Sequence, residues 1–373
     1  MGVWQAVGMF LACAAGTLSA TPQEAVAEGG QSLNLGLGVS TIYDDNFLQY
    51  SDAQLLVFES GLKPDQFSVS TTDDLLMGPS VSLTWLNERG RRRSRSLRLK
   101  WNGEFHKENG TADFRSYSAT WHEGFSRDRR LTLSGFWLPG FYLRQLYDED
   151  VVLAYPGLSR YRRAEFDLGI GSIAWRQRIG ANIRGDAGYQ YEHRSYNPDF
   201  IERTSHTHQA WLRLEIMKLP DHGSIGAYGG YRLSNARATD ADTIADDADV
   251  SYHGIITGLG WRMDFVHNRT SRLGIGMDFD LGTRAYDSNL TTDKYHYKRD
   301  DTSSAVDISL RWAAPPHWAV RGIYRLDHNS AHLGSLAPPG SETGSYTENQ
   351  FGLAVDWSGS LWRQPKATDG EEE

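Results

Sequence analysis

Charged side chains recur at every second position in several segments of this sequence, and apolar side chains stand between them. In one segment, Arg98 and Lys100 alternate with Leu97, Leu99 and Trp101. Residues with this period share one face of a β-strand. A face with both acidic and basic groups can hold water and orient a polar solute. We place fourteen charged residues on such polar faces as candidate site residues: Arg98, Lys100, Glu104, Arg184, Asp186, Arg213, Glu215, Arg262, Asp264, Asp278, Asp280, Asp307, Arg311 and Asp356.

The motifs of common hydrolases are missing from the sequence. We find no Gly-x-Ser-x-Gly nucleophile elbow, no His-Glu-x-x-His zinc motif and no phosphate-binding glycine loop. The remaining candidates for a catalyst are His193, His206, His208 and His253, with Ser or Asp nearby. Scattered histidines are usually surface residues, so we predict that the protein is not an enzyme and needs no cofactor.

Metal and nucleic-acid binding are not expected either. The one cysteine, Cys13, excludes an intrachain disulfide and any CxxC site. The acidic segment 240–249 lacks the central glycine and terminal Glu of an EF-hand, and we interpret it as a solvated loop. The formal net charge of −9 argues against a nucleic-acid partner.

The alternating segments must position the charged faces, and we count about fourteen of them between Gln31 and Gly359. Many are long enough to cross a bilayer as tilted strands, which takes ~9–11 residues. After the first twenty residues, no apolar run approaches the ~18 needed for a membrane-spanning helix. The segments lie at about 32–43, 73–86, 94–106, 114–126, 130–142, 162–177, 180–193, 204–217, 223–235, 250–265, 271–285, 303–313, 317–328 and 345–358.

Short and mostly longer connections alternate between these segments. Residues 126–129 and 178–180 are short turns, whereas 44–72 and 146–160 are long loops. Short turns on one side and long loops on the other are typical of bacterial outer-membrane barrels. With an even number of strands, both ends of the barrel then fall on the short-turn side, which would face the periplasm.

The last segment carries a motif at Gln350–Trp357: a polar residue, a glycine two positions later, then apolar residues at alternate positions. This spacing resembles the C-terminal β-signal of Gram-negative outer-membrane barrels. The resemblance implies an all-β fold, a transmembrane antiparallel barrel of about 14 strands, in which this strand pairs with Leu33–Val39. It also implies that the barrel-assembly machinery binds Gln350–Trp357. The turn Tyr43–Asn46 resembles one in uncharacterised barrels of this kind.

The ends of the chain differ from the alternating region. Met1–Ala27 has the apolar core and small-residue exit of a secretory signal peptide. We predict a single barrel domain over residues 31–359. Residues 360–373 are polar with an acidic end, and we predict a disordered periplasmic tail there.

Two further sets of residues fit a barrel. Aromatic residues near segment ends are candidates for interfacial girdles, with core packing in a soluble sandwich as the alternative: Tyr43, Trp85, Trp121, Trp137, Tyr191, Trp211, Trp261, Trp312, Trp318 and Trp357. Glycines on the polar faces either thin the inner wall or allow the strands to bend, and we favour bending. These are Gly36, Gly38, Gly169, Gly171, Gly258, Gly260, Gly274 and Gly276.

The functional prediction is an outer-membrane channel that passes small polar solutes, or an exported polymer, through a polar lumen of mixed charge. The fourteen charged residues would line that lumen. Lipid and lipopolysaccharide would contact the outside. Alternatives are a structural or surface-binding barrel with an occluded lumen, an outer-membrane hydrolase, and a soluble all-β periplasmic protein. Alternation shows which face is apolar but not whether that face points in or out.

Overall fold

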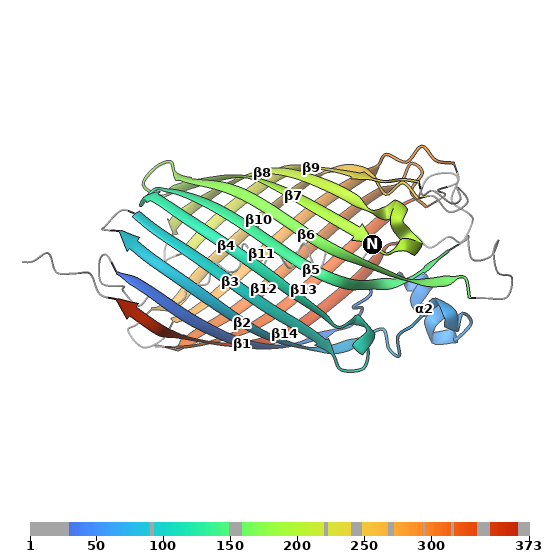
Figure 1. The fold of residues 1–373 in the computed structure, drawn as a ribbon, viewed down its shortest axis with the longest axis horizontal. Coiled ribbons are helices and arrows are strands. Elements are labelled where there is room, and N and C mark those ends of the chain that lie inside the picture. Colours follow the sequence, from blue (N-terminus) through green and yellow to red (C-terminus); the bar gives the residue numbers. More distant parts are fainter. Residues whose placement is uncertain are drawn as a thin grey trace, which may run out of the picture.

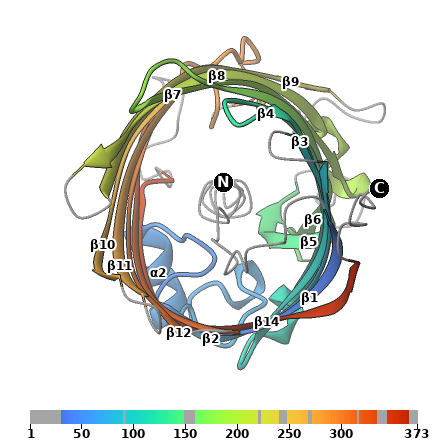
Figure 2. The ribbon, with the colours of Figure 1, turned by 90° about the vertical axis from the view of Figure 1, so that its left-hand side faces the viewer.

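Fourteen antiparallel strands form a closed barrel in the computed structural model (Figures 1 and 2). The structure describes residues 30–89, 93–148, 159–219, 223–239, 248–267, 272–291, 293, 295–314, 317–333 and 344–364. The strands are β1 Gln31–Asp44, β2 Asp74–Arg89, β3 Arg93–His106, β4 Phe114–Ser126, β5 Arg129–Tyr147, β6 Tyr161–Arg178, β7 Ile183–Tyr196, β8 Ser205–Leu219, β9 Gly223–Ala236, β10 Tyr252–His267, β11 Arg272–Tyr286, β12 Asp300–Ala314, β13 Trp318–His332 and β14 Tyr346–Gln364.

Among the described residues, helical structure is confined to the longer connections. An α-helix, α2, spans Asp52–Ser60, and 3-10 turns span Pro64–Gln66, Gly110–Ala112 and Pro198–Arg203. Among the described residues, no helix is long and apolar enough to cross a membrane. The predicted signal peptide, residues 1–27, and residues 365–373 of the predicted tail lie outside the described residues.

Each strand pairs with its neighbour in sequence, and β1 pairs with β14 to close the sheet. The prediction of a closed barrel of about fourteen strands is therefore confirmed. The register at the seam sets Leu37 opposite Trp357 and Asp44 opposite Gln350. Residues 33–39 therefore face 355–362, so the pairing of the two strands is as expected but is offset along the motif.

Two strands, β5 and β14, extend furthest beyond the ranges that the alternation indicates. β5 continues to Tyr147, because register shifts after Leu138 and Tyr142 accommodate Pro139 and Gly140 without ending the ladder. Gly140 has a φ of 57°, which favours glycine. β14 continues to Gln364, so the predicted start of the tail at residue 360 is wrong. A bulge opposite residues 33 and 34 leaves Leu361 and Trp362 exposed beside the apolar outer face of β1.

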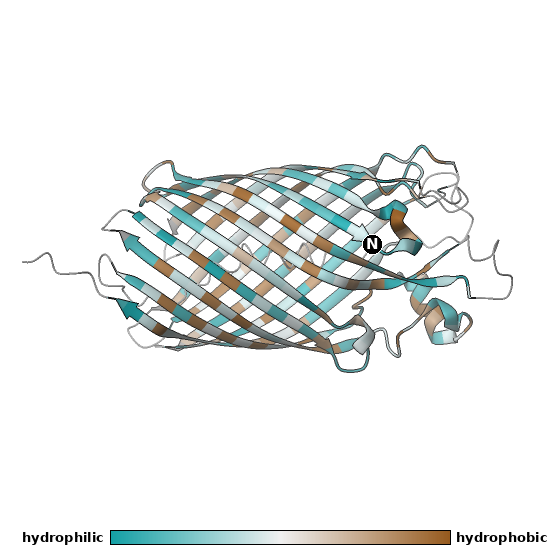
Figure 3. Cartoon of the chain, in the orientation of Figure 1, coloured by the Kyte–Doolittle hydropathy of each residue, from teal (hydrophilic) through white to brown (hydrophobic). Residues whose placement is uncertain are grey.

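The two faces of the wall differ in polarity, and hydrophilic and hydrophobic residues alternate along the strands that face the viewer in Figure 3. The exposed apolar side chains lie on the outer face; Leu212, Leu259 and Leu353 are 67 %, 58 % and 55 % exposed. The side chains between them point into the barrel. The alternative of a soluble protein predicted the opposite arrangement, with the apolar face buried.

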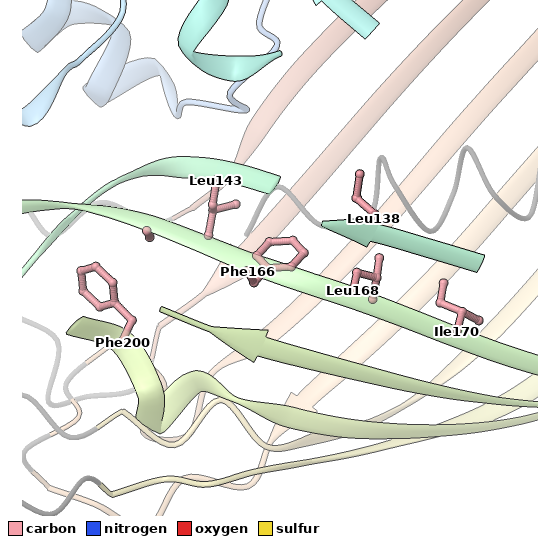
Figure 4. Close-up of a cluster of buried hydrophobic side chains, with 7 residues drawn as sticks. Leu138, Leu143, Phe166, Leu168, Ile170 and Phe200 are labelled. Carbon is pink, nitrogen blue, oxygen red and sulfur yellow. The ribbon is translucent and has the colours of Figure 1, made fainter. Parts of the chain in front are cut away.

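One part of the inner wall is apolar. Leu138 of β5 packs with Phe166, Leu168 and Ile170 of β6, and these side chains are at most 5 % exposed (Figure 4). This inner-wall cluster also includes Leu143, Ala164 and Phe200. Since even-numbered residues of β6 point inward here, Gly169 and Gly171 lie on the outer face. The prediction that these two glycines lie on the lumen side is wrong. β6 has apolar residues on both faces, so its alternation does not show which face points inward.

The connection between β1 and β2, residues 45–73, folds over the end of the barrel that carries the long loops. Figure 1 places α2 at this end, and Figure 2 shows it within the outline of the ring. The helix starts with a capping box, in which Ser51 and Gln54 each accept a hydrogen bond from the other's backbone N–H. Gly61 follows the last helical residue and caps the helix with a φ of 65°. We call this end the loop end and the opposite end the turn end.

Candidate channel lumen

The outside of the barrel has the composition of a surface that meets lipid. Large apolar side chains are exposed around the wall, whereas charged residues of the same strands, such as Arg262 and Asp278 of β10 and β11, point inward. In water this arrangement would be strongly unfavourable, at ~25 cal/mol for each Å² of exposed apolar surface. Closure also leaves no strand edge unpaired, as a bilayer requires. The protein is an outer-membrane β-barrel. Its localisation is the bacterial outer membrane, where closed barrels of this asymmetry reside.

The aromatic residues of this barrel gather at two levels of its outer face. Trp312 and Trp318 flank the β12–β13 turn, and Trp85 stacks on Trp121 near the turn end, with ring centroids 6.0 Å apart. Towards the loop end, Tyr43, Tyr191 and Trp137 are exposed on the outer face. Amphipathic rings are favoured where a bilayer meets water, so this arrangement fits the girdle interpretation.

Trp211 departs from this arrangement. It has the same parity in β8 as Arg213 and Glu215, and its ring lies over Gly188 on the inner face. A Cβ at Gly188 would lie 2.4 Å from the Trp211 ring. Trp211 is therefore a lumen residue, and its assignment to a girdle is wrong.

All fourteen candidate residues lie on the inner face, opposite in parity to the exposed apolar side chains of their strands. Several remain in contact with water. The side chains of Arg262 and Asp278 are 34 % and 38 % exposed, and those of Arg272 and Asp264 are 42 % and 30 % exposed. Water therefore reaches the inner wall along β10 and β11.

Ion pairs between neighbouring strands organise the charges. Arg176 Nε lies 2.5 Å from Asp186 Oδ1, and Arg184 pairs with Glu215. On the other side of the barrel, Arg262, Arg272 and Arg325 lie 3.5–3.7 Å from Asp278, Asp264 and Asp307, respectively. Such pairing compensates much of the charge of these side chains on the inner wall.

Glycines on the inner face make room for carboxylates of the adjacent strand. Gly260 is opposite Asp278, and a Cβ there would lie 2.5 Å from Asp278 Oδ1. The same arrangement recurs for Gly258 with Asp280, Gly274 with Asp264, and Gly38 with Asp356. Each carboxylate thus folds over a bare stretch of backbone. The interpretation of these glycines as bending points did not include this role. The register between strands decides which residue is opposite a glycine, and the alternation within one strand does not show it.

Other charged residues share the inner face and were not among the candidates. Arg130 of β5 and Arg176 of β6 have inward parity, as do Arg321, Arg325 and Asp327 of β13. The parity rule that selected the fourteen would have included these five. Of these, Arg130 and Arg176 add basic charge to the turn end near β5 and β6.

Residues 45–73 are tied to the seam of the barrel by buried and partly buried hydrogen bonds. Asn46 Nδ2 donates to the backbone carbonyls of Tyr50 (2.8 Å) and Thr347 (3.1 Å). Asp45 accepts from the backbone N–H and the side-chain amide of Asn349, at 2.6 and 2.8 Å. Gln49 Nε2 donates to Glu348 at 2.8 Å. The turn Tyr43–Asn46 thus joins the first strand to the start of the last one.

Residues 45–73 also contact β5 and β6, which lie away from the seam between β1 and β14. Ser68 and Tyr142 share a hydrogen bond of 2.5 Å, and Tyr161 donates to Gln66 at 3.2 Å. Arg144 Nη1 donates to Gln54 at 3.4 Å. The segment is therefore held on both sides, and Figure 2 shows its helix α2 within the outline of the ring.

A second group of contacts joins three loop-end connections at Asp293. Its carboxylate accepts hydrogen bonds from the backbone N–H of Asp249 and from His296 Nδ1, each at 2.8 Å. Burial raises the pKa of Asp293, but the hydrogen bond and charge of His296, with the charge of Arg203, outweigh it and leave this pKa below its usual value. Burial lowers the pKa of His296 more than its bond to Asp293 raises it.

The four candidate histidines all lie outside the lumen. His193 stacks on His206 on the outer face of β7 and β8, with ring centroids 4.5 Å apart, and His208 bonds to Tyr189 nearby. His253 Nδ1 lies 2.9 Å from Asp287. In the part of the chain that the structure describes, no cluster of three or more His, Cys, Asp or Glu residues could hold a metal ion. Most of the acidic segment 240–249 lies outside that part.

No protein-family model and no curated protein matches the chain. Among solved structures, it is similar to a bacterial polysaccharide outer membrane secretin, with 9 % identity over 89 % of this chain and 99 % of that one (TM-score 0.44). It is also similar to OmpT of Vibrio cholerae, with 6 % identity over 88 % and 98 % (TM-score 0.41). An anion-selective porin from Comamonas acidovorans shares 9 % identity over 90 % and 100 % (TM-score 0.38).

Proposed function

We propose that this protein is a passive channel that carries small polar solutes across the outer membrane. The observation that supports the proposal is the wet, charged inner wall, where paired side chains such as Arg262 and Asp278 remain about one-third exposed to water. Charge at mid-depth on the lipid face would cost ~2–4 kcal/mol for each Arg or Lys. On the inner face, the same charges line a path in which a polar solute keeps hydrogen-bonding partners.

Residues 45–73 set the width of the loop end in this proposal. They extend from the seam to β5 and β6, and the inner-wall cluster lies beneath the same region. A solute would therefore meet its narrowest passage beside α2. An extended polymer would pass only in single file or after this segment moves.

The experiment is conductance of the purified protein in planar bilayers, with neutral sugars of increasing size to measure the pore. A steady current supports the channel. Sugars small enough to enter the pore should reduce this current, and sugars above a size limit should leave it unchanged. A variant in which a short glycine linker replaces residues 52–66 should conduct more than the natural chain.

A closed wild-type protein would favour the second candidate, a surface barrel with an occluded lumen. The observation behind that candidate is the set of hydrogen bonds that hold residues 45–73 to β14 on one side and to β5 on the other. In that case only the shortened variant would conduct. If neither protein conducts while both show the heat-dependent gel mobility of folded barrels, the channel proposal fails.

We further propose two kinds of partner. Lipid and lipopolysaccharide cover the apolar outer face, and the barrel-assembly machinery binds the last strand at Gln350–Trp357. Phe351 and Leu353 point outward and are 54 % and 55 % exposed, so they are available for that contact. Replacing both with Asn should lower the amount of assembled barrel in outer-membrane fractions. The same change at Ile308 and Leu310 of β12 is the matched control.

A further inference from the structure

A basic cavity lies at the turn end of the barrel, against the inner wall. It has a volume of about 520 Å³ and is formed by the ends of β2 to β8. Seven of the thirteen described residues that line it are arginines, and two are acidic, Glu88 and Asp128. The cavity is therefore rich in basic residues, whereas the inner wall as a whole contains both acidic and basic residues.

The pairing of strands brings several of these arginines directly opposite one another. Arg130 is the cross-strand partner of Arg176, and Arg178 is the partner of Arg184. Like charges in directly opposed positions destabilise a sheet. The wall therefore has a local excess of positive charge that folding alone would not favour.

Ion pairs within the cavity compensate only part of this charge. Arg176 binds Asp186, Arg184 binds Glu215, and Arg178 lies 3.8 Å from Asp128. Arg130 stands beside two of these arginines. Its Nε is buried and has no hydrogen-bond partner among the described residues.

We propose that this cavity is a binding site for an oxyanion, namely a solute that carries more than one carboxylate or phosphate group. Guanidinium groups bind such groups through two parallel hydrogen bonds. A multivalent anion would relieve the repulsion between Arg130 and Arg176 and accept hydrogen bonds from the guanidinium groups that line the cavity. Binding itself is independent of the proposed channel, whereas selection of anionic solutes at the periplasmic mouth rests on it.

The first experiment is calorimetric titration of the folded protein in neutral detergent at low salt. Citrate and inorganic phosphate are the probes and separate carboxylate from phosphate recognition. We expect saturable binding of at least one of them. Arg130→Gln should weaken it about tenfold or more, which corresponds to loss of one charge-assisted hydrogen bond. Arg130→Lys, which keeps the charge, should weaken it less.

Arg262→Gln is the matched control, because Arg262 also faces the lumen but lies on β10, away from the cavity. It should leave the affinity unchanged. Absence of saturable binding of both probes to the natural chain overturns the proposal, as does equal weakening by Arg130→Gln and Arg262→Gln. Heat-dependent gel mobility establishes that each variant is folded.

A second measurement separates this site from the channel itself. Citrate added to the turn-end side of a planar bilayer should block current at lower concentration than citrate added to the loop-end side. Arg130→Gln should remove the difference. Saturable binding without any current would leave the anion site standing and refute the channel, whereas current without binding would refute only the anion site.

Discussion

In this wall, the side chain that a position can accommodate depends on the residue opposite it in the neighbouring strand. Glycines of the inner face are the clearest case, since a carboxylate of the next strand occupies the space where a side chain would stand. Gly254 is more constrained than the rest. A Cβ at this position would lie 1.8 Å from the backbone oxygen of Thr283, and backbone atoms cannot move aside as a side chain can.

We therefore expect Gly254→Ala to destabilise the barrel by about 1–3 kcal/mol, the usual cost of forcing atoms into a packed site. Gly171→Ala is the control, because a Cβ at Gly171 meets nothing within 4 Å. Unfolding in guanidinium, followed by tryptophan fluorescence, measures both. Equal midpoints for the two variants would contradict the steric explanation.

Asn46 should be the residue on which the loop-end segment most depends. Its side chain makes three hydrogen bonds to backbone groups, two with Tyr50 and one with Thr347. Asn46→Ala would leave these groups without partners, at a cost of ~1–3 kcal/mol for each one that stays buried.

Hydrogen exchange of residues 45–73 tests this expectation. Exchange should accelerate in Asn46→Ala and stay unchanged in Asp65→Ala, a change at an exposed position of the same segment. If the segment narrows the lumen, Asn46→Ala should also increase current fluctuations in a bilayer. Unchanged exchange in Asn46→Ala would show that other contacts suffice to hold the segment.

At the scale of elements, the loop-end connections are coupled through Asp293 and His296. The folded state keeps the pKa of His296 below its ordinary value, so the unfolded segment takes up a proton first. Stability of residues 287–299 should therefore fall as pH drops below ~6.5. The lowered pKa of Asp293 acts in the same direction at lower pH, since its contribution is present above ~3.9 and is lost as pH falls through the folded value.

Hydrogen exchange between pH 8 and pH 5, corrected for intrinsic rates, measures this dependence. His296→Gln should flatten it, because glutamine can still donate a hydrogen bond to Asp293 but does not titrate in this range. A slope that is the same in both proteins would assign the effect to another group.

At the scale of the whole molecule, closure depends on the pairing of β1 with β14 along its full length. Leu33 is opposite Trp362, so the residues after Gly359 belong to the seam. A chain truncated after Gly359 should lose its folded gel mobility at a lower temperature than the full chain. Truncation after Gln364 keeps every described strand pair and should leave that temperature unchanged.

Much of this architecture follows from the sequence alone. The period of two identifies the strands, and the lengths of the connections identify the two ends, because both are local properties of the chain. All fourteen strands start within three residues of the ranges predicted from the alternation, and the largest shifts are those of β7, from 180 to 183, and β12, from 303 to 300. The inner parity of residues such as Arg98 and Asp278 follows from the same pattern.

The tertiary structure alone decided the remaining features. Only closure shows that the apolar faces point outward, because alternation is the same for a barrel in lipid and a sandwich in water. Only the register between strands brings Arg130 beside Arg176 and Asp278 over Gly260, because the two residues of each pair lie on different strands. The inner-wall cluster on β5 and β6 likewise depends on which face of a doubly apolar strand meets the lumen. Strand pairing between distant segments is a non-local choice, and no periodicity within one segment determines it.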